Sequence, residues 1–229
     1  MEVAHLVLFV SNILRYFIFA GIPFLIFYKL YKGSFVANKI QERFAEQKDF
    51  TREIFYSLQA ALIFAAIAIV LLHSPLKAYT QIYSDLSSHS LWWVPVSVAL
   101  ALILHDTYFY WMHRMLHHPK LYKKAHLVHH KSITPSPWAS YSFHFFESVL
   151  EGMIAPLILF LIPMHPLSFL LFTVFALIIN VYGHLGFEIA PKWFRNSFLF
   201  QITNSSVHHN LHHEKFWELK YLQWGRRMT

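Results

Sequence analysis

Residues 91–117 read LWWVPVSVALALILHDTYFYWMHRMLH, an apolar run that ends directly in the pair His113 and His117. About 20 mostly apolar residues are enough for a helix to cross a bilayer. Residues three or four apart share one face of a helix, so both imidazoles would point the same way from its end. The stretch therefore predicts a membrane helix that carries potential metal ligands at one end.

Two further runs of histidines have the same helical spacing. They read His126-Leu127-Val128-His129-His130 and His209-Asn210-Leu211-His212-His213. One tetrahedral zinc takes about four ligands, so eight converging imidazoles are too many for one ion and suit two. The chain has no cysteine, which excludes disulfides, iron–sulfur clusters and thiolate zinc sites and leaves imidazole as the main ligand. The sequence therefore predicts a dimetal site.

Other polar residues accompany these runs. Asn180 and His184 lie four residues apart at the end of an apolar segment, where polar side chains usually have a function. The alternative for this pair is a helix cap beside an interfacial histidine. A metal-bound imidazole usually donates its other N–H to a carboxylate or a carbonyl. The residues expected to lie behind the ligands are Asp106, His144, Glu147, Glu188, Glu214 and His208, the last adjoining a ligand but pointing away from the metals.

The composition places the chain in a membrane. Of its 229 residues, 56% are hydrophobic, 18% aromatic and only 14% charged, against about 25% charged in soluble domains. The mean hydropathy is +0.38. Apolar segments also cover 3–28, 54–72, 149–162 and 167–182, the last two forming a hairpin around Pro163-Met164-His165-Pro166. We predict one all-α domain over 1–229, a polytopic membrane protein with four or five membrane helices and a helical cytoplasmic cap that holds the dimetal site.

The distribution of Lys and Arg sets the orientation. Basic residues gather in 29–52, 114–131 and 192–227, whereas 73–90 contains only Lys77. The positive-inside rule puts the three basic regions in the cytoplasm and the N-terminus outside. All three histidine runs then face the cytoplasm. The net charge of +7 is explained by this topology, and no basic stripe indicates binding to nucleic acid.

The histidine runs, together with the lead-in Asp106–Arg114, resemble the histidine boxes of the fatty acid hydroxylase / sterol desaturase superfamily, over roughly residues 100–214. The resemblance implies a membrane-bound diiron oxygenase that uses O2 and external electrons to hydroxylate or desaturate a lipid C–H bond. It implies membrane helices in 1–99, a catalytic region in 100–229, and Asn180 and His184 as the remaining contributors to the site. The expected metal ligands are His113, His117, His126, His129, His130, His184, His209, His212, His213 and Asn180.

The expected cofactors are two iron ions, which zinc can replace on overexpression because imidazole suits both metals. The sequence carries no fused haem-binding domain of the kind found in some relatives, so we expect a separate electron donor such as a ferredoxin or a cytochrome b5 system. The other expected partners are O2 and a lipid substrate from the bilayer, which is a fatty acyl chain, a sterol or a related lipid. A short chain without a fused donor or a retention signal favours the bacterial inner membrane over the endoplasmic reticulum.

A second interpretation is a membrane protein that binds or transports divalent metals. It would need ligands along a path through the bilayer, and the segments 3–28 and 54–72 offer almost none.

The C-terminal segment departs from the family pattern. After the third histidine run, relatives usually have Asn-Tyr-Gly and then Trp-Asp-Arg, whereas 216–227 reads FWELKYLQWGRR. The resemblance therefore does not extend to the segment that would close the cytoplasmic side of the site.

Overall fold

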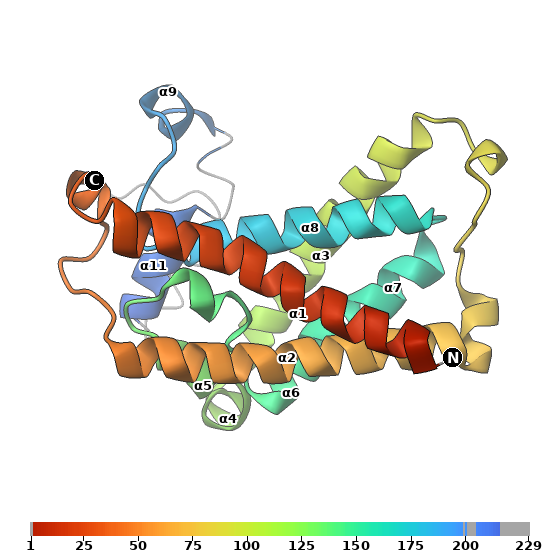
Figure 1. The fold of residues 1–229 in the computed structure, drawn as a ribbon, viewed down its shortest axis with the longest axis horizontal. Coiled ribbons are helices and arrows are strands. Elements are labelled where there is room, and N and C mark those ends of the chain that lie inside the picture. Colours follow the sequence, from red (N-terminus) through yellow and green to blue (C-terminus); the bar gives the residue numbers. More distant parts are fainter. Residues whose placement is uncertain (1, 199, 201–204, 216–229) are drawn as a thin grey trace.

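The computed structural model describes residues 2–198, 200 and 205–215, so the C-terminal segment 216–229 lies outside the described residues. Four long helices dominate the fold, and each is long and apolar enough to cross a membrane. They are α1 (Glu2–Phe24) with its π-helical continuation η1 (Leu25–Leu30), α2 (Gln47–His73), α3 (Trp93–Leu116) and α8 (Pro166–Gly183) (Figure 1). No strand occurs in the described part, which contains only two isolated β-bridges. The all-α membrane fold is confirmed.

The predicted hairpin is also present. Its first arm is broken into α6 (Phe145–Gly152) and α7 (Ile154–Leu161), and its second arm is α8. His165 ends the turn by accepting a hydrogen bond on Nδ1 from the Leu167 N–H, 3.1 Å away, and Pro166 occupies the first turn of α8. A proline is tolerated there because its missing N–H would have no partner in the helix. His165 therefore has a structural role at the start of α8.

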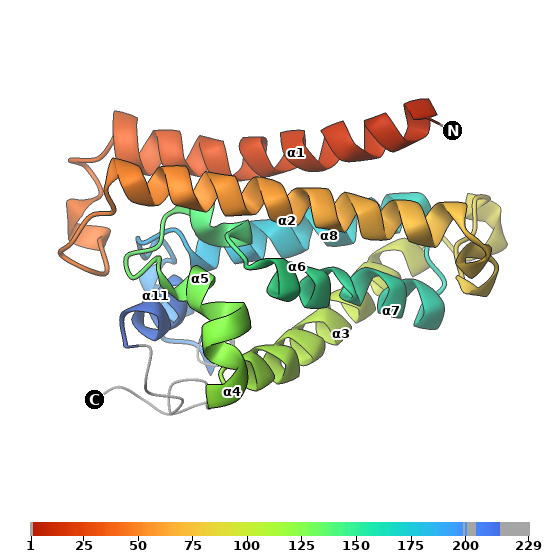
Figure 2. The same cartoon turned by 90° about the horizontal axis from the view of Figure 1, so that it is seen from below.

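The short elements divide between the two ends of the bundle (Figures 1 and 2). One end carries the N-terminus, η3 (Pro75–Tyr79) and η4 (Leu86–Ser88). The other end carries η2 (Val36–Asn38), α4 (Pro119–Leu121), η5 (Tyr122–His126), α5 (Leu127–His130), η6 (Pro137–Tyr141), α9 (Lys192–Arg195) and α11 (Ser206–Glu214). This second group forms the predicted helical cap and, with the end of α3, contains all three histidine runs.

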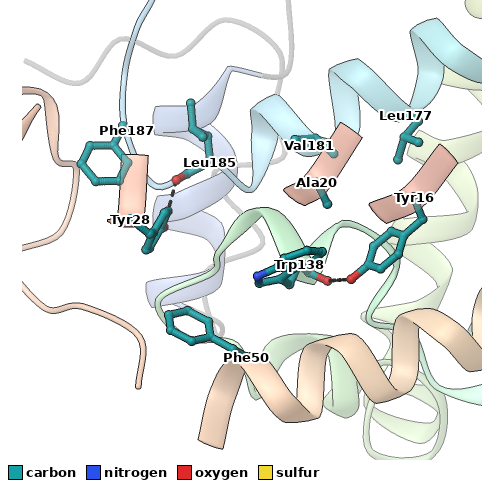
Figure 3. Packing of buried hydrophobic residues seen from close by; sticks show 9 residues of the cluster. All are labelled: Tyr16, Ala20, Tyr28, Phe50, Trp138, Leu177, Val181, Leu185 and Phe187. Carbon is teal, nitrogen blue, oxygen red and sulfur yellow. Dashed lines mark hydrogen bonds between the residues drawn. The ribbon is translucent and has the colours of Figure 1, made fainter. Parts of the chain in front are cut away.

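The cap is inserted into the bundle through Trp138 of η6. Its indole packs among aromatic and aliphatic side chains of α1, α2 and α8 (Figure 3). Its backbone carbonyl accepts hydrogen bonds from the Tyr16 hydroxyl at 2.8 Å and from the Ser57 hydroxyl at 2.9 Å. A backbone carbonyl without a partner in this apolar setting would cost several kcal/mol. The buried cluster comprises Tyr16, Ala20, Tyr28, Phe50, Trp138, Leu177, Val181, Leu185 and Phe187.

Cysteine labelling checks the sidedness of this arrangement. We expect Lys124→Cys in the cap to react with a membrane-impermeant maleimide from the cytoplasmic side, and Ser87→Cys in η4 to react only from the opposite side. The chain has no native cysteine, so each variant carries one reactive thiol. The unsubstituted protein serves as the blank, and labelling of both variants from one side would contradict the topology.

Candidate metal centre

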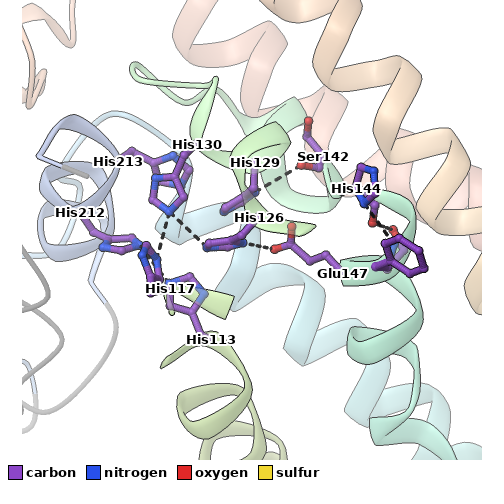
Figure 4. Close-up of polar contacts among 12 residues, drawn as sticks. His113, His117, His126, His129, His130, Ser142, His144, Glu147, His212 and His213 are labelled. Atoms are coloured by element: carbon purple, nitrogen blue, oxygen red, sulfur yellow. Dashed lines mark hydrogen bonds and ion pairs between the residues drawn. The ribbon is translucent and has the colours of Figure 1, made fainter. Parts of the chain in front are cut away.

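Five buried histidines form a first group, whose potential ligand atoms all lie within 4.8 Å of one another. His212 brings its Nε2 to 2.9 Å from that of His113 and 3.1 Å from that of His117. His130 Nε2 lies 3.2 Å from the Nε2 atoms of both His117 and His126. The imidazoles of α3, η5, α5 and α11 therefore converge on one point (Figure 4).

A second group of four buried histidines comes from α5, from the end of α8 and from α11. His184 is its centre. The Nε2 of His184 is 2.9 Å from that of His209 and 3.4 Å from that of His129. His213 completes the group with its Nε2 3.2 Å from that of His209. The nine predicted histidines thus divide into one group of five and one group of four.

The two histidine-histidine doublets create this division. At 100° per residue, positions i and i+4 share a face and position i+3 points to one side of it. In the second run, His126 and His130 accordingly join the first group while His129 joins the second. In the third run the assignment is reversed, with His209 and His213 in the second group and His212 in the first. The helices α5 and α11 therefore each serve both groups.

The separations fit ligands that share a cation. Two nitrogens bound at about 2.1 Å to one ion lie about 3.0 Å apart at an angle of 90° and about 3.4 Å apart in a tetrahedron. The observed separations of 2.9–3.4 Å fall on this range. His129 and His184 each use their single N–H at Nδ1 toward a carbonyl, so their Nε2 atoms, 3.4 Å apart, both present lone pairs and cannot hydrogen-bond each other. The residues present therefore fit two bound metal ions.

Three ligand candidates are oriented through their second ring nitrogen. His126 Nδ1 lies 2.6 Å from Glu147 Oε1, and His184 Nδ1 lies 2.8 Å from the backbone carbonyl of Asn180. His129 Nδ1 faces the carbonyl of Ser142 at 3.4 Å. Donation of the Nδ1 proton to these acceptors leaves the lone pair of Nε2 directed at the metal position.

Burial keeps the imidazoles neutral. It lowers the pKa of His117 and His184 to about 4 and that of His212 to about 3. The pKa values of the remaining cap histidines lie well below the ordinary value, first through desolvation and then through their neighbours; these are His126, His129, His130, His209 and His213. Only the neutral ring binds a metal, so the site is in its binding form at neutral pH. Burial also raises the pKa of Glu147, and a cation on His126 would favour its ionised form.

Several residues expected behind the ligands lie elsewhere. Asp106 is exposed on α3, seven residues or about 10 Å of helix before His113, too far for a hydrogen bond. His144 caps α6 by accepting a hydrogen bond from the Phe146 N–H at 3.3 Å. His208 packs on Phe200, with ring centroids 6.1 Å apart. Among the described residues, none of the three hydrogen-bonds a ligand candidate.

Within the described residues, Glu188 and Glu214 do not hydrogen-bond the ligand candidates either, whereas Asn180 contacts His184 through its backbone. Glu188 accepts hydrogen bonds from the Tyr182 hydroxyl and the Ala190 N–H, each at 2.7 Å, and Glu214 is exposed. Asn180 donates from its side-chain amide to the Ser140 carbonyl at 2.7 Å. Its contact with the site runs through its backbone carbonyl, which orients His184. A role for Asn180 as a ligand stays a prediction.

A buried amide network that the sequence does not indicate holds α11 in place. Gln41 donates from Nε2 to the side-chain oxygen of Asn210 at 2.7 Å and to the Ile133 carbonyl at 2.9 Å. Thr134 donates its hydroxyl to Gln41 Oε1 at 2.9 Å. Asn210 stands between His209 and His212 in the third run, so this network fixes the run against the loop after α5. No local pattern could have revealed it, because Gln41 is 169 residues from Asn210.

Comparison with known proteins gives one family and several relatives. The model of the fatty acid hydroxylase family, described as "Fatty acid hydroxylase", matches residues 98–228. The chain is 29% identical over 165 residues to a Delta(7)-sterol 5(6)-desaturase of Gibberella zeae, covering 72% of this chain and 50% of that protein. It is 29% identical over 175 residues to human lathosterol oxidase, covering 76% and 56%. With a Delta(7)-sterol 5(6)-desaturase of Schizosaccharomyces pombe it is 30% identical over 164 residues, covering 72% and 52%.

The chain therefore spans about half the length of these curated relatives. No solved structure matches it.

Metal analysis tests the division into two groups. We expect two metal ions per purified chain, falling to about one in His184→Ala, because this substitution removes the only contribution of α8 to the group of four. His165→Ala is the matched control, since His165 caps the far end of the same helix. Inductively coupled plasma mass spectrometry gives the ratio, and a wild-type value of one or none would contradict the dinuclear site.

A second substitution tests the contact behind His126. Glu147→Leu removes the acceptor of the Nδ1 proton, and loss of such a contact typically weakens metal binding about 10–100-fold. Competition with a chromophoric chelator measures this affinity. Glu42→Leu in the exposed loop before α2 should leave it unchanged. Equal affinities in both variants would mean that Glu147 does not orient the ligand.

Proposed function

The chain belongs to the fatty acid hydroxylase family, and on that premise we propose that it is a membrane-bound oxidoreductase that uses two iron ions, O2 and external electrons to hydroxylate or desaturate a lipid C–H bond. The observation that carries the proposal is the convergence of nine buried, neutral imidazoles in two groups at one end of a membrane helix bundle. Iron bound there would supply O2 activation. The groups of five and four histidines would hold the two ions.

Both reactions balance with the same external supply. Hydroxylation consumes the substrate, one O2, two electrons and two protons, and gives the alcohol and one water. Desaturation consumes the same reagents, removes two hydrogens from adjacent carbons and gives the alkene and two waters. We propose that a separate carrier protein supplies the two electrons.

In this proposal the residues of the chain bind the metals, orient the imidazole rings and shield the reacting carbon from water. The nine histidines hold the metals, and Glu147 with the carbonyls of Ser142 and Asn180 fix the direction of three rings. The two histidine groups lie at the cap end of the candidate membrane helices, and we propose that an aliphatic substrate approaches them sideways from the bilayer. Phe109 stacks on His113, with ring centroids 5.1 Å apart, and provides an apolar wall on the membrane side. Such walls exclude water from the reacting carbon.

The relatives suggest the first substrates to test. Their names describe oxidation of lathosterol and desaturation of Delta(7)-sterols at the 5(6) position. We therefore propose a lipid with a fused-ring or similarly rigid apolar body as the substrate class. The relatives come from fungi and mammals, so they do not favour the bacterial inner membrane over the endoplasmic reticulum. The proposal places the metal site on the cytoplasmic side in either membrane.

The alternative of a divalent-metal transporter is less consistent with the placement of the histidines. All nine histidine ligand candidates lie in or beside the cap. Within the described residues, α1 and α2 contribute His5 and His73, which pack together at the opposite end with ring centroids 4.5 Å apart. Ligands at two ends, without a series of ligands between them along these helices, do not form a path for an ion.

Activity measurements with matched variants test the proposed function. We expect His129→Ala and His212→Ala to abolish oxidation, because each removes a ligand candidate from a different group, whereas His165→Ala stays near the wild-type rate. The assay combines reductant-dependent O2 uptake in nanodiscs with mass spectrometry of lathosterol and of total membrane lipids. Full activity of His129→Ala would exclude a catalytic role for the second group. Normal metal content without oxidation of any lipid would favour the metal-binding alternative.

A further inference from the structure

A cluster of lysines lies on the outer surface of the cap. Residues 107–146 contain no Asp or Glu, and within this stretch Lys120, Lys123 and Lys124 are exposed on α4 and η5. We call these three residues the lysine patch. In the part of the chain that the structure describes, none of them has an ion-pair partner. Other basic residues at this end are exposed as well, namely Lys29, Lys32, Arg43, Lys131, Lys192 and Arg195, whereas Arg52 is paired with Asp49 at 2.8 Å.

The lysine patch follows directly after the candidate membrane helix α3. Trp111, which is 61% exposed, stands near the end of α3, and the Arg114 guanidinium lies 5.8 Å from its ring centroid. Tryptophan and arginine in this arrangement are typical of the interface between lipid headgroups and water. The helix α3 continues to Leu116, and α4 and η5 follow after it. The lysines are therefore placed to meet a protein in solution.

The same surface is the outer side of the first metal group. The π-helical turn η5 carries Lys123 and Lys124 and ends at the ligand candidate His126. Tyr122, which begins this turn, is buried with its ring centroid 5.6 Å from those of both His117 and His130. A redox partner seated on the lysine patch would thus stand one helical turn from the ligands of the group of five.

We propose that the lysine patch is the docking surface for the acidic face of a one-electron carrier protein, which delivers electrons to the metals through the first group. This inference rests on the proposed function, since a metal-binding protein without a redox reaction would need no such partner. The carrier is oxidised by one electron at each encounter, and two encounters supply the two electrons of one turnover. Complementary charge accelerates such encounters about 10–1,000-fold at low salt and loses its effect as salt screens it.

The test uses an acidic plant-type ferredoxin as the probe and two charge-reversal variants. One carries Lys123→Glu with Lys124→Glu. The matched control carries Lys192→Glu with Arg195→Glu, two basic residues of α9 at the same end of the molecule. Binding of oxidised ferredoxin is measured by biolayer interferometry on metal-free and on metal-loaded protein. Stopped-flow absorbance then follows the oxidation of reduced ferredoxin by the loaded protein.

We expect the patch variant to bind ferredoxin at least about tenfold more weakly than the wild type, in both metal states, and the α9 variant to change by less than about twofold. The rate constant for oxidation of ferredoxin should fall in parallel, and the difference should vanish at about 1 M salt. Basic cytochrome c should not bind to the wild type. Equal ferredoxin binding by all three proteins, or equal effects of the two variants, would overturn the inference.

Two further measurements distinguish carrier docking from lipid binding and from loss of the oxidase reaction itself. If the patch variant loses only the thermal stabilisation given by phosphatidylglycerol nanodiscs and binds ferredoxin normally, the lysines contact lipid headgroups and the inference is wrong. O2 uptake driven by dithionite bypasses the carrier. Normal uptake with dithionite but unaltered ferredoxin kinetics in the patch variant would reject the docking surface and leave the proposed function standing. Specific ferredoxin binding without lipid oxidation by any reductant would reject the proposed function instead.

Discussion

The fold depends on the convergence of nine buried imidazole lone pairs. Each ring has lost most of its contact with water, and burial makes protonation of the cap histidines unfavourable, so they cannot relieve their mutual repulsion by gaining protons. A cation between the rings turns this repulsion into ligation. Metal binding would therefore be linked to folding of the cap, because the free energy of ligation would also hold α3, α5, α8 and α11 together.

The bundle contributes a rigid frame through a few buried polar contacts. Tyr16 and Ser57 hold the carbonyl of Trp138, and Ser136 donates a hydrogen bond to the buried carboxylate of Glu53 on α2. These contacts fix the segment that follows the second histidine run. Gln41 fixes the third run through Asn210. Polar side chains inside the apolar bundle are costly unless they are paired, and here the pairs connect membrane helices to the cap.

Much of this arrangement follows from the sequence because it depends on local periodicity. The lengths of the apolar segments predict the helices, and the spacing of three and four residues predicts which histidines share a face. The helical rotation of 100° per residue also assigns the two histidines of each doublet to different groups. A count of the histidines alone does not reveal this assignment. The acceptors behind His129 and His184 are backbone carbonyls, which every residue has, so no residue type could mark them. The sequence predicts the Asp106 carboxylate as one of the acceptors behind the ligands. In the structure, two turns of helix separate Asp106 from His113.

Because the two runs interleave, two metal ions held by these groups would depend mechanically on each other. His129 and His130 are adjacent on α5 but belong to different groups, and His212 and His213 are related in the same way on α11. A rotation of either helix that brings one imidazole closer to its ion moves its neighbour relative to the other ion. Only one orientation of α5 and α11 therefore satisfies both groups at once. His113 and His117 on α3 and His184 at the end of α8 each belong to a single group, so α5 and α11 are the helices that would couple two bound ions to each other.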